Sequence, residues 1–170
     1  EAEKAGMDVF DYISYPRSGY GKIGFHCDMG PTQFAEVRQA ITYCLDRPEF
    51  ARQFSAGYAI VVNSRYGVAQ WMYADDPDKV EEALNPYTYS IENAKQVLID
   101  GGWTLNEAGE EFVEGTDEIR YKEVDGELMP CIIKWADTDN EDAKLLRQML
   151  PENMAAAGMK LESTIMDFPA

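Results

Sequence analysis

Apolar residues recur every three or four positions in several stretches of the chain, which is the spacing of one helix face. The clearest such stretch is 34–45, and a longer one at 140–157 contains Pro151, where we expect a kink or a restart. Residues with N-capping or helix-ending chemistry delimit further helices. We expect these at 1–5, 46–54, 78–84 and 90–101.

Other stretches alternate between apolar and polar positions, as strands do. The stretches 9–15 and 20–27 flank turn residues and predict one hairpin, while 119–124 and 127–136 flank Asp125-Gly126 and predict a second. A last strand is expected at 159–166, after Gly158. This mixture of elements predicts an α/β (α+β) fold, with residues 1–170 forming a single domain.

The net charge of the chain argues against some classes of binding partner. Among 170 residues, 31 are acidic and 15 are basic, which gives a net charge of −16. Such a surface repels phosphate backbones, so we expect no nucleic-acid partner. No apolar run approaches the roughly 18 residues of a membrane span. Cys27, Cys44 and Cys131 are too few for a disulfide framework, and we expect all three to be small buried hydrophobes.

Catalytic chemistry finds little support in the sequence. His26 is the single histidine, and the adjacent Cys27 would point to the other face of a strand. The acidic run 137–142 lacks the glycine of a calcium loop and is better explained by N-capping from Asp139 or Asn140. We therefore expect no catalytic residues, no metal site, no cofactor and no enzymatic activity.

The segment 57–89 is rich in aromatic residues and weak in regular pattern. A long loop of this kind is unusual in a compact domain unless it is functional. Its aromatic side chains either anchor the core or form a concave apolar surface for a ligand. Asn63, Ser64 and Arg65 would supply polar groups to such a surface.

Four motifs occur in an order that is typical of one family. They are Val37-Arg38-Gln39-Ala40-Ile41 with Asp46-Arg47, the helix Tyr89-Ser90 to Gly101-Gly102-Trp103, the strand 22–27 before Pro31, and the helix-glycine-strand unit 143–162. In these motifs the chain resembles the extracellular solute-binding proteins of family 5, the receptors of peptide-type ABC importers. His26 stands where the family commonly has asparagine, and the acidic insertion 107–123 is longer than usual.

This resemblance implies a periplasmic-binding-protein-like half: a single mixed sheet flanked by helices, forming part of the second lobe of a two-lobed receptor. The first lobe, a lipoprotein signal and a downstream ligand-binding segment would lie outside the given sequence. The implied partners are a peptide or other small solute and ABC permease subunits. The implied location is extracellular, either as a cell-surface lipoprotein or in the periplasm. Without the first lobe, exposed aromatics and an unpaired strand edge predict a weak homodimer.

Position and chemistry suggest which residues would line the ligand cleft. Aromatic residues would form apolar walls, while His26, Asp28 and Asn63 would hydrogen-bond the solute and Asp28 would pair with an amine. Arg38, Gln39 and Ala40 are expected to serve folding instead. The alternative is a structural or protein-interaction domain without small-molecule binding. The full set of predicted ligand-binding residues is Phe25, His26, Asp28, Tyr58, Asn63, Tyr66 and Trp71.

Overall fold

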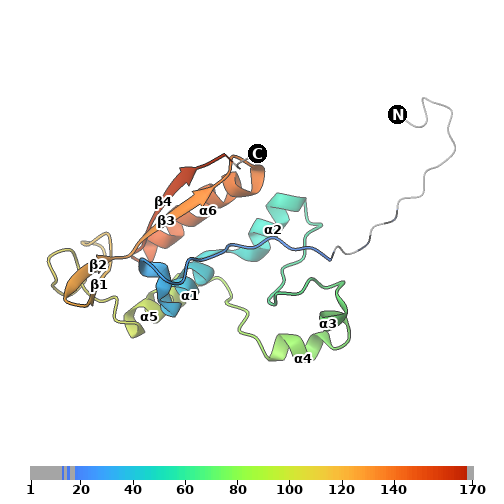
Figure 1. The fold of residues 1–170 in the computed structure, drawn as a ribbon, viewed down its shortest axis with the longest axis horizontal. Helices are drawn as coiled ribbons and strands as arrows, with labels where there is room; N and C mark the ends of the chain where they lie inside the picture. Colours follow the sequence, from blue (N-terminus) through green and yellow to red (C-terminus); the bar gives the residue numbers. More distant parts are fainter. Residues whose placement is uncertain (1–12, 14, 16–17, 168–170) are drawn as a thin grey trace. The chain divides into compact units, whose positions relative to one another are not determined.

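A computed structural model describes residues 13, 15 and 18–167 (Figure 1). The chain divides into two compact units, one made of 1–22 and 62–85 and the other of 23–61 and 86–170, which are described separately below. The helix expected at 1–5 lies outside the described residues, as does most of the strand expected at 9–15. Residues 20–27 form no strand, so the first predicted hairpin is wrong in its second half.

Two ten-residue helices pack against each other in the larger unit. A short 3-10 turn, η2 (Pro31–Gln33), leads into α1 (Ala35–Cys44), and α5 (Ile91–Asp100) packs beside it (Figure 1). The side of α1 that faces the core consists of fully buried or nearly buried residues, namely Val37, Ala40, Ile41 and Cys44. The hydroxyl of Ser90 accepts the N–H of Asn93 at 3.1 Å and caps α5. Apolar spacing predicted α1, and the N-cap with the glycine stop predicted α5; both helices are confirmed.

Helix α2 (Arg47–Ser55) follows α1 after two linking residues, Leu45 and Asp46. A carboxylate oxygen of Asp46 accepts the N–H of Glu49 at 3.0 Å, which confirms the predicted N-cap. The helix ends at Ala56, whose φ of 52° lies in the left-handed region. Helix α2 then contacts α6, the longest helix of the unit.

Helix α6 (Glu141–Ala156) begins where the side chain of Asn140 accepts the N–H of Ala143 at 3.0 Å. Its buried face consists of Ala143, Leu146, Leu150 and Met154, as the spacing predicts. The helix continues through Pro151 without a break, so the expected restart does not occur. Pro151 is exposed while the residues before and after it in the buried stripe remain packed, which holds the helix together where one backbone hydrogen bond is missing.

The strands form two separate two-stranded sheets. Strands β1 (Tyr121–Val124) and β2 (Glu127–Pro130) pair antiparallel, and the turn residues Asp125 and Gly126 both have positive φ, as the predicted hairpin requires. Strands β3 (Ile132–Asp137) and β4 (Lys160–Ile165) pair in parallel, with α6 as the crossover that covers them (Figure 1).

Cys131 explains why the expected single mixed sheet is divided in two. Its N–H donates to the carbonyl of Arg120 at 2.8 Å, while its own carbonyl accepts the N–H of Lys160 at 3.0 Å. The backbone thus leaves one pair of strands and joins the other at this residue, and the predicted strand 127–136 becomes β2 and β3. The α/β class is confirmed; the single mixed sheet is not.

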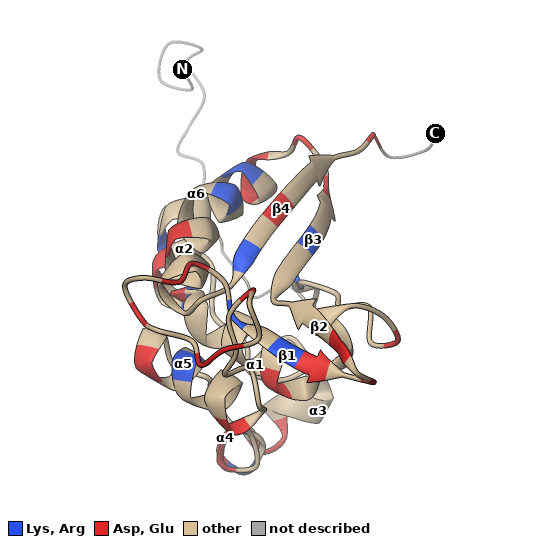
Figure 2. Cartoon of the chain, turned by 90° about the vertical axis from the view of Figure 1, so that its left-hand side faces the viewer, with Lys and Arg blue, Asp and Glu red and all other residues tan. Residues whose placement is uncertain are grey.

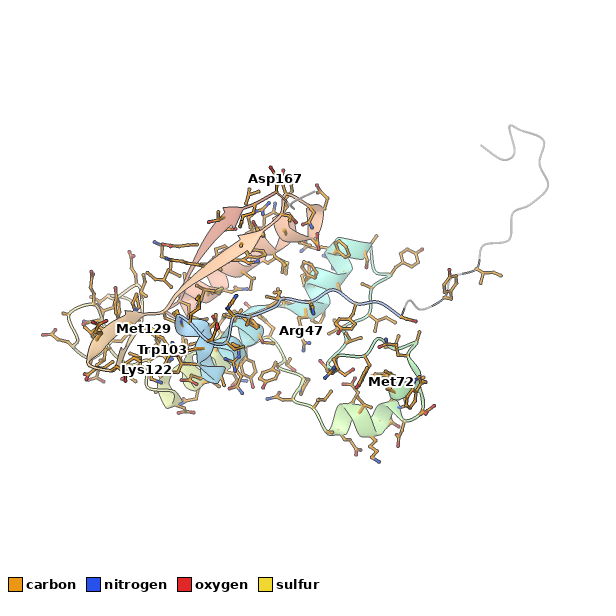
Figure 3. All side chains as sticks on the ribbon, in the orientation of Figure 1. Arg47, Met72, Trp103, Lys122, Met129 and Asp167 are labelled. Atoms are coloured by element: carbon orange, nitrogen blue, oxygen red, sulfur yellow. The ribbon has the colours of Figure 1, made fainter. Side chains whose placement is uncertain are left out.

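A buried arginine ties the ends of three segments together. The guanidinium of Arg120 donates to the carbonyls of Ala157 at 3.1 Å and Trp103 at 3.2 Å, and lies 4.1 Å from the ring centroid of Phe112. Burial lowers the pKa of Arg120 from its ordinary value. Figure 3 labels Trp103 near Lys122, whose ammonium lies 6.0 Å from the indole ring. Trp103 is fully buried. Gly102, with a φ of 83°, ends α5 just before it, and the N–H of Trp103 donates to the carbonyl of Leu98 at 2.9 Å.

The smaller unit is more ordered than its sequence pattern indicates. Helix α3 (Trp71–Ala74), which was not predicted, is followed by α4 (Pro77–Glu82), which confirms the helix expected at 78–84. The carboxylate of Glu81 accepts the side-chain amide of Asn63 at 2.7 Å and the hydroxyl of Tyr73 at 3.0 Å. The side chain of Glu81 therefore holds both Asn63 and α3, through Tyr73, against α4.

Candidate ligand-binding site

The two polar site residues predicted near residue 27 contact each other. Nδ1 of His26 lies 2.8 Å from a carboxylate oxygen of Asp28, and both side chains are about three-quarters exposed. The hydrogen bond from His26 lowers the pKa of the Asp28 carboxyl. Asp28 is thus an ionised surface carboxylate, suited to an amine or an amide donor. Cys27 between them is exposed, so the expectation that all three cysteines are buried is wrong for this one.

The aromatic candidates differ in their surroundings. Phe25 is half-buried and packs against the hydrophobic core. Tyr58 in the larger unit is 79% exposed, and Trp71 in the smaller unit is 70% exposed. Neither side chain anchors the core, so the first of the two roles considered for these aromatic residues does not apply to them. Tyr66 is half-buried beneath the guanidinium of Arg65, 5.8 Å from the ring centroid.

The seven predicted residues fall in both units. Phe25, His26, Asp28 and Tyr58 belong to the larger unit, while Asn63, Tyr66 and Trp71 belong to the smaller one. Within the smaller unit, the amide of Asn63 is engaged by Glu81 rather than directed at open space. A single cleft formed by all seven remains a prediction.

The larger unit contains a shallow pocket that the sequence did not single out as a site. Its volume is about 270 Å³, and its floor is the side of α1 opposite the core. Positions 35, 38, 39 and 42 have the spacing of one helix face, which is the signal that would have found it. Of the predicted residues only Phe25 belongs to it. The full lining is Phe25, Ala35, Arg38, Gln39, Thr42 and Tyr87.

Hydrogen bonds hold the polar lining of this pocket in place. Nη1 of Arg38 donates to the carbonyls of Thr32 at 2.7 Å and Gln33 at 2.9 Å, so Arg38 does support the local fold, as expected. The side-chain amide of Gln39 donates to the hydroxyl of Tyr87 at 3.2 Å. Ala40, the third residue assigned to folding, is fully buried. Arg38 and Gln39 therefore combine a structural role with a place in the pocket.

In the part of the chain that the structure describes, neither the distribution of charged residues nor the placement of potential metal ligands indicates a further site. Acidic positions are spread over most elements, including β1 and β4, each of which also carries a lysine (Figure 2). Among residues 13, 15 and 18–167, no three histidine, cysteine or acidic side chains gather to hold a metal ion. None of the described helices has the length and apolar character needed to cross a membrane.

The fold is shared with solved receptors for small solutes. An oligopeptide-binding protein of Thermus thermophilus, solved with a pentapeptide, has a TM-score of 0.60 at 20% identity over 76% of this chain and 19% of its own. The oligopeptide-binding protein AppA of Bacillus subtilis, solved with a nonapeptide, has a TM-score of 0.61 at 23% identity over 79% and 24%. NikA of Brucella suis, solved with Fe(III)-EDTA, has a TM-score of 0.56 at 21% identity over 82% and 24%.

These likenesses show a shared fold. The family model of the bacterial extracellular solute-binding proteins, family 5, matches residues 1–170. The chain belongs to this family. A search of curated protein sequences found no match. The chain spans about a fifth to a quarter of the length of the three solved proteins.

Proposed function

We propose that this chain is part of an extracellular substrate-binding protein that captures peptides or similar solutes for an ABC importer. The observation that carries the proposal is the match of the family model to the whole chain, residues 1–170. The solved relatives support it, since two of them were crystallised with peptides and one with a metal chelate. Family membership also favours solute binding over catalysis.

In the complete receptor, two lobes would close on the solute, and the closed form would dock on the permease subunits. The chain would supply part of the second lobe as one domain. Its proposed location is the cell surface, through a lipid anchor, or the periplasm. The structural alternative, an interaction domain without a small-molecule ligand, would show no solute binding in any form of the receptor.

The proposed ligand contacts use the exposed side chains described above. Asp28 would pair with an amine of the solute, and His26 and Asn63 would donate or accept hydrogen bonds. Phe25, Tyr58, Tyr66 and Trp71 would form apolar walls, because aromatic surface is the main lining of solute pockets. The exposure of Tyr58 and Trp71 supports this role, since fully packed side chains would not be available to a ligand.

Substitutions in the complete receptor test these contacts. Trp71→Ala and Asp28→Asn should each weaken peptide binding about tenfold or more, measured as the dissociation constant by fluorescence or calorimetric titration. Phe54→Ala and Asp75→Asn are matched controls, because both positions are exposed and neither is a proposed contact. Equal affinities for all four variants and the unchanged receptor would remove these residues from the site.

A further inference from the structure

The pocket on the exposed side of α1 has a wall that is fixed before any ligand arrives. The segment around Tyr87 is attached at three points, two on α1 and one at the first residue of α2. The amide of Gln39 donates to the hydroxyl of Tyr87, the carbonyl of Tyr43 accepts the N–H of Ser90 at 3.0 Å, and the guanidinium of Arg47 donates to the carbonyl of Pro86. A wall held in this way loses little freedom when a ligand binds.

The backbone of Tyr87 adds an independent observation. Its φ of 43° lies in the left-handed region, which a large side chain seldom adopts. Such a conformation persists only where the surroundings hold it, and it is common at ligand sites. Here it presents the phenol ring to both the pocket and Tyr43, whose ring centroid lies 5.2 Å away.

Arg38 is the one charged residue among the six that line the pocket. None of the six lining residues is acidic, although the chain carries a net charge of −16. In the described part of the chain, the side-chain hydrogen bonds of Arg38 start at Nη1 and end on neutral carbonyls. Its remaining N–H groups form a planar fork that matches a carboxylate.

We propose that this pocket binds the carboxylate end of the solute, with the carboxylate on Arg38 and an adjoining apolar group between Phe25 and Tyr87. The amide of Gln39 and the hydroxyl of Thr42 would flank the carboxylate. A volume of about 270 Å³ lies just below the range of whole-ligand pockets, about 300–1,000 Å³, and so suits one end of a longer molecule. For a peptide, this end is the carboxyl-terminal residue. The inference rests on the proposed function and deepens it.

The test compares Ala-Ala-Phe with its carboxyl-terminal amide, titrated by calorimetry against the complete receptor that carries this chain. The acid should bind roughly 10- to 100-fold more tightly than the amide, the range expected for a charge-assisted hydrogen-bond pair. Arg38→Met should bring this ratio close to one. Arg52→Met is the matched control, because Arg52 is exposed on α2 and pairs with Glu49, and it should leave the ratio unchanged.

A second variant guards against a loss of folding in Arg38→Met, since Arg38 also binds the carbonyls of Thr32 and Gln33. Ala35→Phe adds bulk at an exposed lining position and removes no contact. It should weaken binding of Ala-Ala-Phe about tenfold, by filling the space for the apolar group. Ala156→Phe, at an exposed position of α6, should not.

The outcomes separate this inference from the proposed function. If peptides bind and neither Arg38→Met nor Ala35→Phe changes the ratio or the affinity, the carboxylate binds elsewhere and the inference is overturned, while the proposed function stands. If the unchanged receptor binds neither Ala-Ala-Phe nor its amide, the inference is also overturned. The proposed function fails only if a broader set of peptides and metal chelates gives no binding either.

Discussion

Cys44 and Asn153 exchange hydrogen bonds across 109 positions of the chain. The side-chain amide of Asn153 donates to the carbonyl of Cys44 at 2.9 Å, and the thiol of Cys44 donates to the carbonyl of Asn153 at 3.6 Å. This pair joins the last residue of α1 to α6. It satisfies one of the carbonyls that every helix leaves open at its end.

Asn153→Ala should therefore lower the free energy of unfolding by about 1–3 kcal/mol, the cost of leaving a partly buried carbonyl without its donor. Chemical denaturation followed by circular dichroism measures this. Gln148→Ala, at an exposed position of the same helix, should change stability by less than about 0.5 kcal/mol. Equal effects of the two variants would show that the hydrogen bond does not stabilise the helix pair.

Gly158→Ala should be among the more damaging single substitutions. Gly158 has a φ of 84°, and an added Cβ would lie 2.7 Å from Cγ of the buried Arg120. The strained backbone costs about 1–2 kcal/mol and the overpacking a further 1–3 kcal/mol. Gly115→Ala separates the two costs, because Gly115 has a φ of 82° with open space around it. Similar unfolding free energies for both variants would contradict the close approach to Arg120.

The three thiols should differ in reactivity. Burial raises the pKa of Cys44 and of Cys131 to about 12, whereas Cys27 is exposed. At pH 8 a thiol reagent should therefore label one cysteine per native chain and three per unfolded chain. Mass spectrometry after digestion identifies the labelled residue. Rapid labelling of Cys44 or Cys131 in the native chain would contradict their burial.

The same two cysteines predict a pH dependence of stability. Both keep their protons in the folded chain up to about pH 12 but lose them near their ordinary value of 9.0 once unfolded. The stability they contribute is complete below pH 9 and is lost as the pH rises toward 12. A Cys44→Ala, Cys131→Ala variant should show a smaller decline in unfolding free energy over this interval. An identical decline would assign it to other groups.

Much of the fold could be predicted from local sequence. The caps at Asp46, Ser90 and Asn140 and the turn at Asp125-Gly126 all occur as expected, because they depend on residues within a few positions of one another. The strand break at Cys131 could not be predicted this way. It depends on hydrogen bonds to Arg120 and Lys160, which are distant in sequence.

The candidate site was predicted less completely. Position and chemistry suggested Asp28, Tyr58 and Trp71, and the structure leaves these side chains exposed. Tyr87 was missed because its role depends on a left-handed backbone and a bond to Gln39, neither of which has a local sequence pattern. Arg38 was assigned to folding alone, whereas the structure also places it in the lining of the pocket.

The chain by itself should form a weak homodimer that strengthens as salt rises. Exposed apolar side chains such as Tyr58 and Ile60 favour association, while the net charge of −16 opposes it. Salt screens this repulsion over about 8 Å at physiological ionic strength and leaves burial unchanged. Sedimentation velocity near 100 μM, on the order of a weak dissociation constant, is the measurement. A monomer at both low and high salt would contradict the prediction.

Calorimetric titration of the complete receptor with mixed di- to pentapeptides tests the central claim most directly, with the chain 1–170 alone as the matched control. We expect the complete receptor to bind peptides with a dissociation constant of about 1 μM or below. The chain alone should give no measurable heat, because part of one lobe would bury too little surface to offset the cost of association. Absence of binding by the complete receptor to any peptide would contradict the assignment as a peptide receptor. Micromolar binding by the chain alone would contradict the requirement for two lobes.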